Sequence, residues 1–208
     1  MQTSFLGDIV LTTPLIAELA DRGPVDVITT RAGSAILSNN PGIRNVMIYD
    51  RRGADRGIAG FARTVSRIRC AKYDAAYLAQ GSIRSALIVS LTGVQRRIGF
   101  NTSEGRRLYT HCVEYRADRH HAERLWWLAM NSSTTGPSES QITPRLYPSE
   151  ADSRAAMRVI EEQLGGHRRP IVALAPGSAW GTKRWPYFPE LASKIAQRCN
   201  VVVVGGPA

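Results

Sequence analysis

The chain has 208 residues, a hydrophobic fraction of 43% and a formal net charge of +10, from 27 lysines and arginines against 17 aspartates and glutamates. A core of this size suits one large domain, or one domain with part of another. The basic surface favours anionic partners, but the arginines show neither interleaved aromatic residues nor an RNA-binding signature that would favour nucleic acid, so most of them are expected to form a solvated face. Its three cysteines lie far apart without a C-x-x-C pair, which argues against a disulfide framework or a zinc site and favours a reducing cytoplasm.

The first apolar segment, 9–20, predicts a helix that is entered through the turn Phe5-Leu-Gly-Asp8. No basic residue precedes it, it contains Pro14, and it is too short to cross a bilayer, so we expect neither a signal peptide nor a membrane span. A strand-to-helix turn follows a strand, and only residues 1–4 stand where that strand should be. We therefore expect the first sheet to lack an edge strand.

Apolar runs then alternate with helical patterns as far as residue 130. This alternation predicts an α/β protein with a parallel sheet and helices on both faces. Residues 131–140 are rich in Ser, Thr, Gly and Pro and are interpreted as the loop that closes a first domain, 1–148. The predicted strands are 25–29, 46–49, 75–79, 97–100 and 109–113, and the predicted helices are 34–39, 58–69, 83–91 and 121–130.

A second domain is predicted over 149–208. Its expected elements are a helix at 150–164 that stops at two glycines, a buried strand at 171–174, a helix at 187–197 and a strand at 201–204. Two strands with so few helices cannot bury a parallel sheet on both faces. We therefore expect this domain to be incomplete and the sequence to be a fragment at both ends.

The segment APGSAWGTKRWP, 175–186, is the most informative motif, because it connects a buried strand to a helix. Such connections lie at the ligand-binding edge of a parallel sheet. Gly177 allows close backbone approach, Ser178 and Thr182 can donate hydrogen bonds, and Lys183 adds a charge, a set that suits a diphosphate. The alternative is a surface turn with a solvated Lys183, and the residues alone leave both interpretations open.

Asp8 follows Gly7 at the start of the first predicted helix and also has two interpretations. As a helix cap, Asp would satisfy free backbone N–H groups, and this is the favoured one. As a general base, it would take a proton from a substrate hydroxyl in a cleft. His120 and His121 are adjacent and would point to different faces of a helix, so we expect solvated or capping roles rather than a metal pair.

Four segments, in this order, are similar to the ADP-heptose:lipopolysaccharide heptosyltransferases of glycosyltransferase family 9, closest to the heptosyltransferase II group. They are QTSFLGDIVLTTPLI, YDAAYLAQGSIRSAL, RRIGF and APGSAWGTKRWP, and together they span almost the whole chain. The resemblance implies the GT-B fold: a Rossmann-like amino-terminal domain for the acceptor, then a Rossmann-like domain for the nucleotide sugar, of which only the beginning is present. The family's aspartate-glycine-histidine segment would lie beyond Ala208.

The resemblance also assigns roles to residues. Asp8 matches the family's proposed catalytic base, and Lys183 matches a catalytic residue that stabilises the leaving ADP. The donor phosphates would contact Ser178, Thr182 and Lys183. The acceptor side would hold Gly7, Gln80, Gly81 and Arg84, although Gln80-Gly-Ser also fits an ordinary helix entry capped by Ser82.

The implied function is transfer of heptose from ADP-L-glycero-D-manno-heptose to the lipopolysaccharide inner core, with inversion and with neither a cofactor nor an obligatory metal. The alternative is an inactive fragment that keeps at most acceptor binding. The implied partners are the nucleotide sugar and an anionic, lipid-linked core oligosaccharide, without nucleic acid. Both of these partners fit a cytoplasmic protein that contacts the cytoplasmic face of the inner membrane peripherally.

Overall fold

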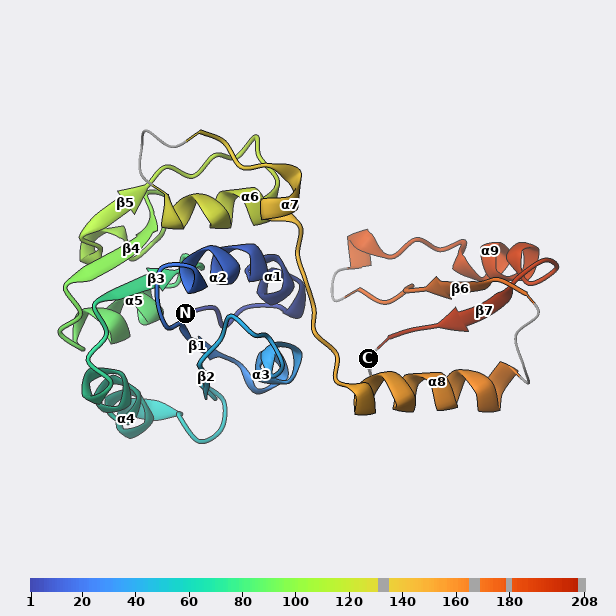
Figure 1. Ribbon diagram of the computed structural model, residues 1–208, viewed down its shortest axis with the longest axis horizontal. Coiled ribbons are helices and arrows are strands. Elements are labelled where there is room, and N and C mark those ends of the chain that lie inside the picture. Colours follow the sequence, from blue (N-terminus) through green and yellow to red (C-terminus); the bar gives the residue numbers. More distant parts are fainter. Residues whose placement is uncertain (131–134, 165–168, 179–180, 206–208) are drawn as a thin grey trace. The chain divides into compact units, whose positions relative to one another are not determined.

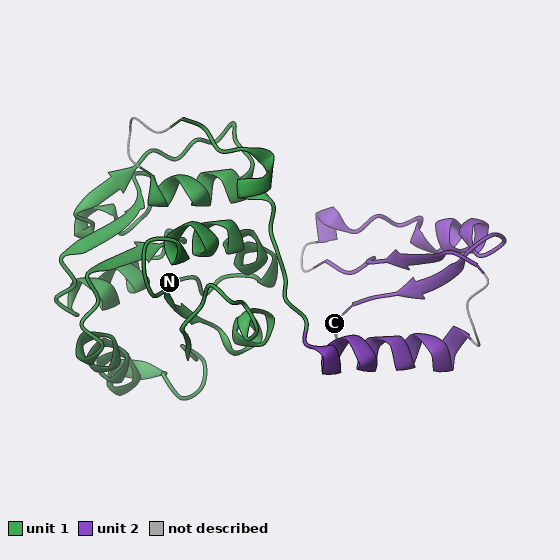
Figure 2. Ribbon diagram, viewed as in Figure 1, with its two compact units in different colours: residues 1–148 green, residues 149–208 purple. Residues whose placement is uncertain are grey.

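The computed structural model of the chain describes residues 1–130, 135–164, 169–178 and 181–205. The chain divides into two compact units, Met1–Pro148 and Ser149–Ala208, which are coloured separately in Figure 2.

The described residues of unit 1 form five strands, and each strand pair among them is parallel (Figure 1). The first pair joins β1 (Asp26–Thr29) to β2 (Asn45–Ile48). A second group has the order β3-β4-β5, with β3 at Ala75–Leu78, β4 at Arg96–Phe100 and β5 at His111–Val113. The predicted parallel α/β fold is confirmed, and each strand begins within two residues of its predicted start.

Met1 and Gln2 connect these two groups of strands. The Gln2 N–H donates to the Ile28 carbonyl at 2.9 Å, while the Met1 amino group donates to the Tyr77 carbonyl at 2.6 Å and the Met1 carbonyl accepts from the Ala79 N–H at 3.2 Å. The strand order across unit 1 is therefore β2-β1, then Met1 and Gln2, then β3-β4-β5. The prediction of a missing edge strand is wrong in its position, since this segment lies at the centre of the sheet.

Helices cover both faces of this sheet (Figure 1). The single helix predicted for 9–20 is instead α1 (Leu6–Leu11) and α2 (Thr13–Ala20), because Pro14 has no N–H to donate to the preceding turn. The other described helices of unit 1 are α3 (Arg31–Leu37), α4 (Gly57–Cys70), α5 (Ile83–Ser90), α6 (His121–Trp126) and α7 (Glu139–Ile142), with 3-10 turns at Arg106–Leu108 and Trp127–Ala129.

The predicted loop 131–140 is described only in part. Residues 131–134 lie outside the described residues, and residues 139 and 140 begin α7.

The core of unit 1 follows the alternation of side chains along the strands. Val27 packs with Ile9 and Leu37 of the α1 and α3 side, whereas its neighbour Ile28 packs with Ile68 and Ile88 of the α4 and α5 side. A third cluster joins α2 and α6 to β4 through Leu15, Ile98, Phe100 and Leu125. Burial on both faces explains why the strands read as short apolar runs rather than as alternating patterns.

Unit 2 contains α8 (Glu150–Leu164), β6 (Ile171–Leu174), the 3-10 turn Gly181–Lys183, α9 (Phe188–Ile195) and β7 (Asn200–Val203). The two strands pair in parallel. The two predicted stop glycines, 165 and 166, lie outside the described residues. Among the residues of this unit that the structure describes, Leu174 alone is buried, as expected for a pair of strands that has too few helices to cover it.

Candidate functional site

A cavity of about 470 Å³, lined mostly by residues with polar side chains, lies in unit 1 at the carboxyl ends of the central strands. Its walls come from the segment after Gln2, the turn after β3, the loop after β4, the segment after β5 and the start of α6. Asp8, Gln80, Gly81, Ser103, Tyr115 and His121 are among the lining residues. In open parallel sheets this edge is where ligands bind.

Asp8 lies in the first turn of α1, not at its cap position. The cap position is taken by Phe5, whose side chain makes no capping hydrogen bond within the described part of the chain. The Asp8 Oδ2 atom accepts a hydrogen bond from the Ser4 hydroxyl at 2.8 Å, and the side chain is 38% exposed. The capping interpretation of Asp8 is therefore wrong, and its carboxylate is held by Ser4 in the wall of the cavity.

His121 stands beside this carboxylate, with its Nε2 atom 3.9 Å from Asp8 Oδ1. Burial, together with the nearby positive charge of Arg124, lowers the pKa of His121 below its ordinary value of 6.5, against the opposing effect of Asp8. The neutral ring is therefore the form that faces Asp8 at neutral pH. Sequence reasoning missed this residue, because no local pattern shows that the start of α6 meets the start of α1.

His120 does have one of the roles expected for it. Its Nδ1 atom accepts the N–H of Ala122 at 3.3 Å and so caps α6 through its side chain. Among the described residues no three His, Cys, Asp or Glu side chains are grouped as a metal ion would need.

Gln80 lines the cavity, but its amide is engaged with the protein. Its Nε2 atom donates to the hydroxyls of Thr3 and Ser85, both at 2.7 Å, and its Oε1 atom accepts the Thr3 N–H at 3.1 Å. Gln80 therefore ties the segment before α1 to α5, and Gly81 supplies the adjacent backbone. Ser82 occupies the cap position of α5, yet within the described residues its side chain makes no capping hydrogen bond.

Arg84 and Gly7 are not among the residues that line the cavity. The Arg84 guanidinium stacks on Phe61, 5.4 Å from the ring centroid, and its Nε atom donates to the Tyr49 hydroxyl at 2.5 Å. The Arg84 Nη2 atom is buried without a hydrogen-bond partner among the described residues. The predicted acceptor set is thus divided: Gln80 and Gly81 share the cavity with Asp8, whereas Arg84 packs against aromatic rings and Gly7 lies exposed in α1.

The predicted donor loop belongs to unit 2. Thr182 and Lys183 lie in the 3-10 turn after β6 with exposed side chains, and the Arg184 Nε atom donates to the Ser178 carbonyl at 2.9 Å. This hydrogen bond joins the two parts of the loop that contain the predicted phosphate-binding residues, Ser178 on one side and Thr182 and Lys183 on the other. Residues 179 and 180 lie outside the described part, and the phosphate-binding roles of Ser178, Thr182 and Lys183 stay predictions.

The two units are built from parallel strands connected through helices, and a cavity lined mostly by polar side chains stands at the carboxyl ends of the strands in unit 1. This combination defines a Rossmann-like α/β class of ligand-binding protein. The chain belongs to glycosyltransferase family 9, the heptosyltransferase family, whose model matches residues 61–208.

The similarity to individual members extends over nearly the whole chain. Lipopolysaccharide heptosyltransferase 2 of Escherichia coli K12 is 25% identical over 217 residues, which cover 99% of this chain and 62% of that protein. Among solved structures, a family 9 glycosyltransferase from Veillonella parvula matches with a TM-score of 0.79 and 20% identity, over 99% of this chain and 61% of that chain.

The structure of E. coli ADP-heptose lipopolysaccharide heptosyltransferase II matches with a TM-score of 0.74 and 23% identity, over 98% of this chain and 62% of that chain. These matches establish the GT-B fold for the chain, which spans about three fifths of the length of its relatives. Within the described residues, no helix has both the length and the apolar character that crossing a bilayer demands.

Proposed function

We propose that the chain provides the acceptor side, and the beginning of the donor side, of an inverting heptosyltransferase. This enzyme would transfer heptose from ADP-L-glycero-D-manno-heptose to the lipopolysaccharide inner core. The observation that carries the proposal is the position of Asp8: a carboxylate anchored by Ser4 in the wall of a cavity of about 470 Å³. Family membership and the names of the matched relatives support the choice of substrates.

In the proposed reaction Asp8 is the general base. Its carboxylate accepts the proton of an acceptor hydroxyl while that oxygen forms a bond to the anomeric carbon of heptose. The bond from this carbon to the diphosphate breaks, and ADP leaves with the electron pair. A single displacement of this kind inverts the configuration at the anomeric carbon.

The donor loop of unit 2 has the complementary task. Negative charge grows on the diphosphate as it leaves, and a fixed cation stabilises that charge more in the transition state than in the ground state. Lys183 supplies the cation, while Ser178 and Thr182 donate hydrogen bonds to the phosphate oxygens. With these groups the transfer requires neither a cofactor nor an obligatory metal.

The acceptor is an anionic, lipid-linked core oligosaccharide, for which the net charge of +10 is favourable. Such an acceptor lies at the cytoplasmic face of the inner membrane. We infer that the protein works in the cytoplasm and contacts that membrane peripherally.

A transfer assay with ADP-heptose and a heptose-deficient core acceptor tests the proposal. Because the chain spans 62% of the E. coli relative, the assay uses a chimera in which the chain continues into the remaining carboxyl-terminal part of that relative. Asp8→Asn keeps the shape of the side chain and should lower the rate at least about 100-fold, the lower range for loss of a general base. Asp21→Asn, an exposed acid after α2, is the matched control and should keep full activity.

Full turnover by Asp8→Asn would remove Asp8 from the mechanism. If the unsubstituted chimera, which keeps Asp8, is folded but shows no transfer, the result would instead favour the alternative that the chain is an inactive fragment. Calorimetry with ADP on the chain as it stands separates donor affinity from transfer, since saturable binding locates the donor site in the residues present.

A further inference from the structure

Apolar side chains are exposed on the outer side of α4 and α5. Ile83, Leu87 and Leu91 follow one another at intervals of four residues, so they lie along one side of α5. Ile58, the second residue of α4, is exposed as well. The four residues are 41% to 89% exposed, whereas a surface helix normally turns polar residues outward. We call these four residues the α4–α5 face.

The two helices lie side by side on the same face of the sheet (Figure 1). Ile68 of α4 and Ile88 of α5 share one core cluster, and the Arg84 guanidinium of α5 stacks on Phe61 of α4. Each helix connects one strand to the next in a parallel sheet, so both helices run in the same direction. Ile58 and Ile83 therefore stand at the same end of the helix pair, the end that begins at the carboxyl edge of the sheet.

Positive charge surrounds the α4–α5 face on the side of α4. From 51 to 72 the chain has seven exposed arginines and lysines against a single acid, Asp55. Asp55 is 4% exposed, and its carboxylate accepts the Asp50 N–H at 2.9 Å, so it does little to offset the surface charge. The seven cations are Arg51, Arg52, Arg56, Arg63, Arg67, Arg69 and Lys72.

The other side of α5 is basic as well. The 3-10 turn Arg106–Leu108 lies against this side, since Leu108 packs in one cluster with Ala86 of α5. Arg106 and Arg107 are exposed there, next to one exposed acid, Glu104. Neither α4 nor α5 contains an Asp or a Glu. The apolar residues are thus bordered by cations on two sides.

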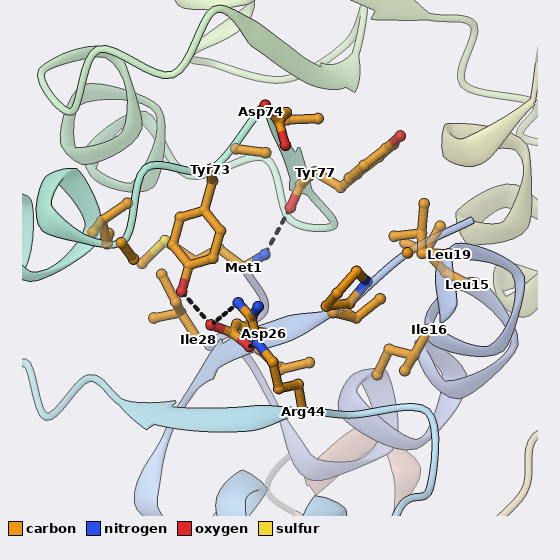
Figure 3. Close-up of a pocket in the computed structure, with 18 of the residues that line it drawn as sticks. Met1, Leu15, Ile16, Leu19, Asp26, Ile28, Arg44, Tyr73, Asp74 and Tyr77 are labelled. Carbon is orange, nitrogen blue, oxygen red and sulfur yellow. Dashed lines mark hydrogen bonds and ion pairs between the residues drawn. The ribbon is translucent and has the colours of Figure 1, made fainter. Parts of the chain in front are cut away.

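The helix pair is fixed to the sheet near both ends. Just after α4, the Tyr73 hydroxyl donates to the Asp26 carboxylate of β1 at 2.6 Å, and the Arg44 guanidinium donates to the same carboxylate at 2.8 and 2.9 Å (Figure 3). In the first turn of α5, the Arg84 Nε atom donates to the Tyr49 hydroxyl at 2.5 Å. The exposed apolar residues are therefore held in place before a partner arrives, which lowers the entropic cost of docking.

We propose that the α4–α5 face docks on the surface of an anionic lipid bilayer. Its apolar side chains enter the headgroup region, where they leave water, and the surrounding arginines contact lipid phosphates. A nucleic acid would use the charge but not the apolar residues. A second copy of the chain would bring an equally basic face against this one. An anionic bilayer matches both the charge and the apolar residues.

The position of the face suits a lipid-linked acceptor, and in this respect alone the inference rests on the proposed function. Gly81 and Ser82 line the cavity that contains Asp8, and Ile83 follows them directly. One end of the face therefore adjoins the cavity wall. With the face on the membrane, a sugar in the cavity stays within reach of the lipid to which it is attached.

Cosedimentation with vesicles tests the docking, with both the chain and the chimera described above. Each should bind vesicles that contain phosphatidylglycerol at least about tenfold more tightly than vesicles of phosphatidylcholine alone. Leu87→Gln with Leu91→Gln should weaken binding to the anionic vesicles at least about tenfold, because two apolar side chains are lost. Arg56→Gln with Arg69→Gln should have an effect of about the same size and should make the binding less sensitive to salt.

Matched controls remove exposed residues of the same kinds that do not belong to the face. They are Leu146→Gln, and Arg154→Gln with Arg158→Gln in α8, and both should leave vesicle binding nearly unchanged. Equal binding to the two kinds of vesicle, or equal losses in the controls and the face variants, would overturn the proposal. It would also be overturned by RNA binding that the arginine variant loses and the leucine variant keeps, or by a dimer that the leucine variant abolishes.

Transfer assays separate this inference from the proposed enzyme activity. In the chimera, Leu87→Gln with Leu91→Gln should keep transfer to a soluble, delipidated core acceptor and should lower transfer to an acceptor anchored in anionic vesicles several-fold. Equal rates with the parent on both acceptors would contradict the docking. An inert chimera would contradict the proposed function, while its vesicle binding would still decide whether the face docks. If the chain alone does not fold, the chimera decides.

Discussion

The Nε2 atom of His121 lies 3.9 Å from the Oδ1 atom of Asp8, inside the cavity at the carboxyl ends of the central strands. One residue stands in the first turn of α1 and the other at the start of α6, so only the packing of these helices brings them together. The protonation state of His121 therefore changes the electrostatic potential at the proposed base, and transfer should depend on pH through this residue.

We predict that transfer by the chimera falls by a few fold as the pH drops below 6.5, and that His121→Gln removes this fall. Burial and Arg124 lower the pKa of His121, so the ring is neutral at pH 7 and becomes a cation only in more acidic solution. A cation beside Asp8 pairs with its carboxylate and so opposes transfer of the acceptor proton to it. The measurement is kcat/KM against pH for both forms, and superimposable profiles would contradict the assignment.

The buried amino terminus predicts a second pH effect, on stability. The pKa of the Met1 ammonium is about 5 in the folded chain against 8.0 for an exposed group. The unfolded chain therefore binds more protons between these values, and the free energy of unfolding should increase as the pH rises from 5 to 8, by up to about 4 kcal/mol.

Urea unfolding across this range measures the effect. His121 contributes with the same sign, because its pKa is lowered as well. Acetylation of Met1 isolates the ammonium, since it removes that titration and leaves His121 in place. The idea fails if the acetylated and free forms have the same slope of stability against pH.

Gly7→Ala separates a binding role of Gly7 from a structural one. A Cβ at this position would meet no atom within 4 Å, and alanine is the better helix former, so the variant should be as stable as the parent or up to about 1 kcal/mol more stable. If the acceptor approaches this backbone, the added methyl group should raise KM for the acceptor several-fold with little change in KM for ADP-heptose. Unchanged steady-state constants would take Gly7 out of the acceptor site.

Lys183→Ala should weaken ADP binding by about tenfold or more, the usual cost of losing a charge-assisted hydrogen bond. Lys194→Ala is the matched control, because Lys194 is an exposed lysine of the same unit in the last turn of α9. Calorimetry at one fixed salt concentration compares the two, since a general loss of positive charge affects both equally. Equal affinities of the two variants for ADP would instead support the interpretation of Lys183 as a solvated surface lysine.

The sequence by itself determined the parallel α/β class, the bounds of most elements and the family. Runs such as Ile171–Leu174 and the helical period of Glu150–Leu164 are local signals, because the conformation of each residue depends mainly on its neighbours along the chain. Gln80, Gly81 and Asp8 were also singled out from their motifs, and the structure brings all three to one cavity.

Tertiary structure alone decided which distant residues meet. In the structure Met1 and Gln2 lie at the centre of the sheet and not at its edge. Asp8 lies in the first turn of α1 and not at its cap position, with His121 beside it. Arg84 packs against Phe61 and Tyr49. These outcomes depend on backbone pairing between separate strands and on which helix faces are buried together. Neither quantity has a local pattern in the sequence, because each is settled by the packing of the whole unit.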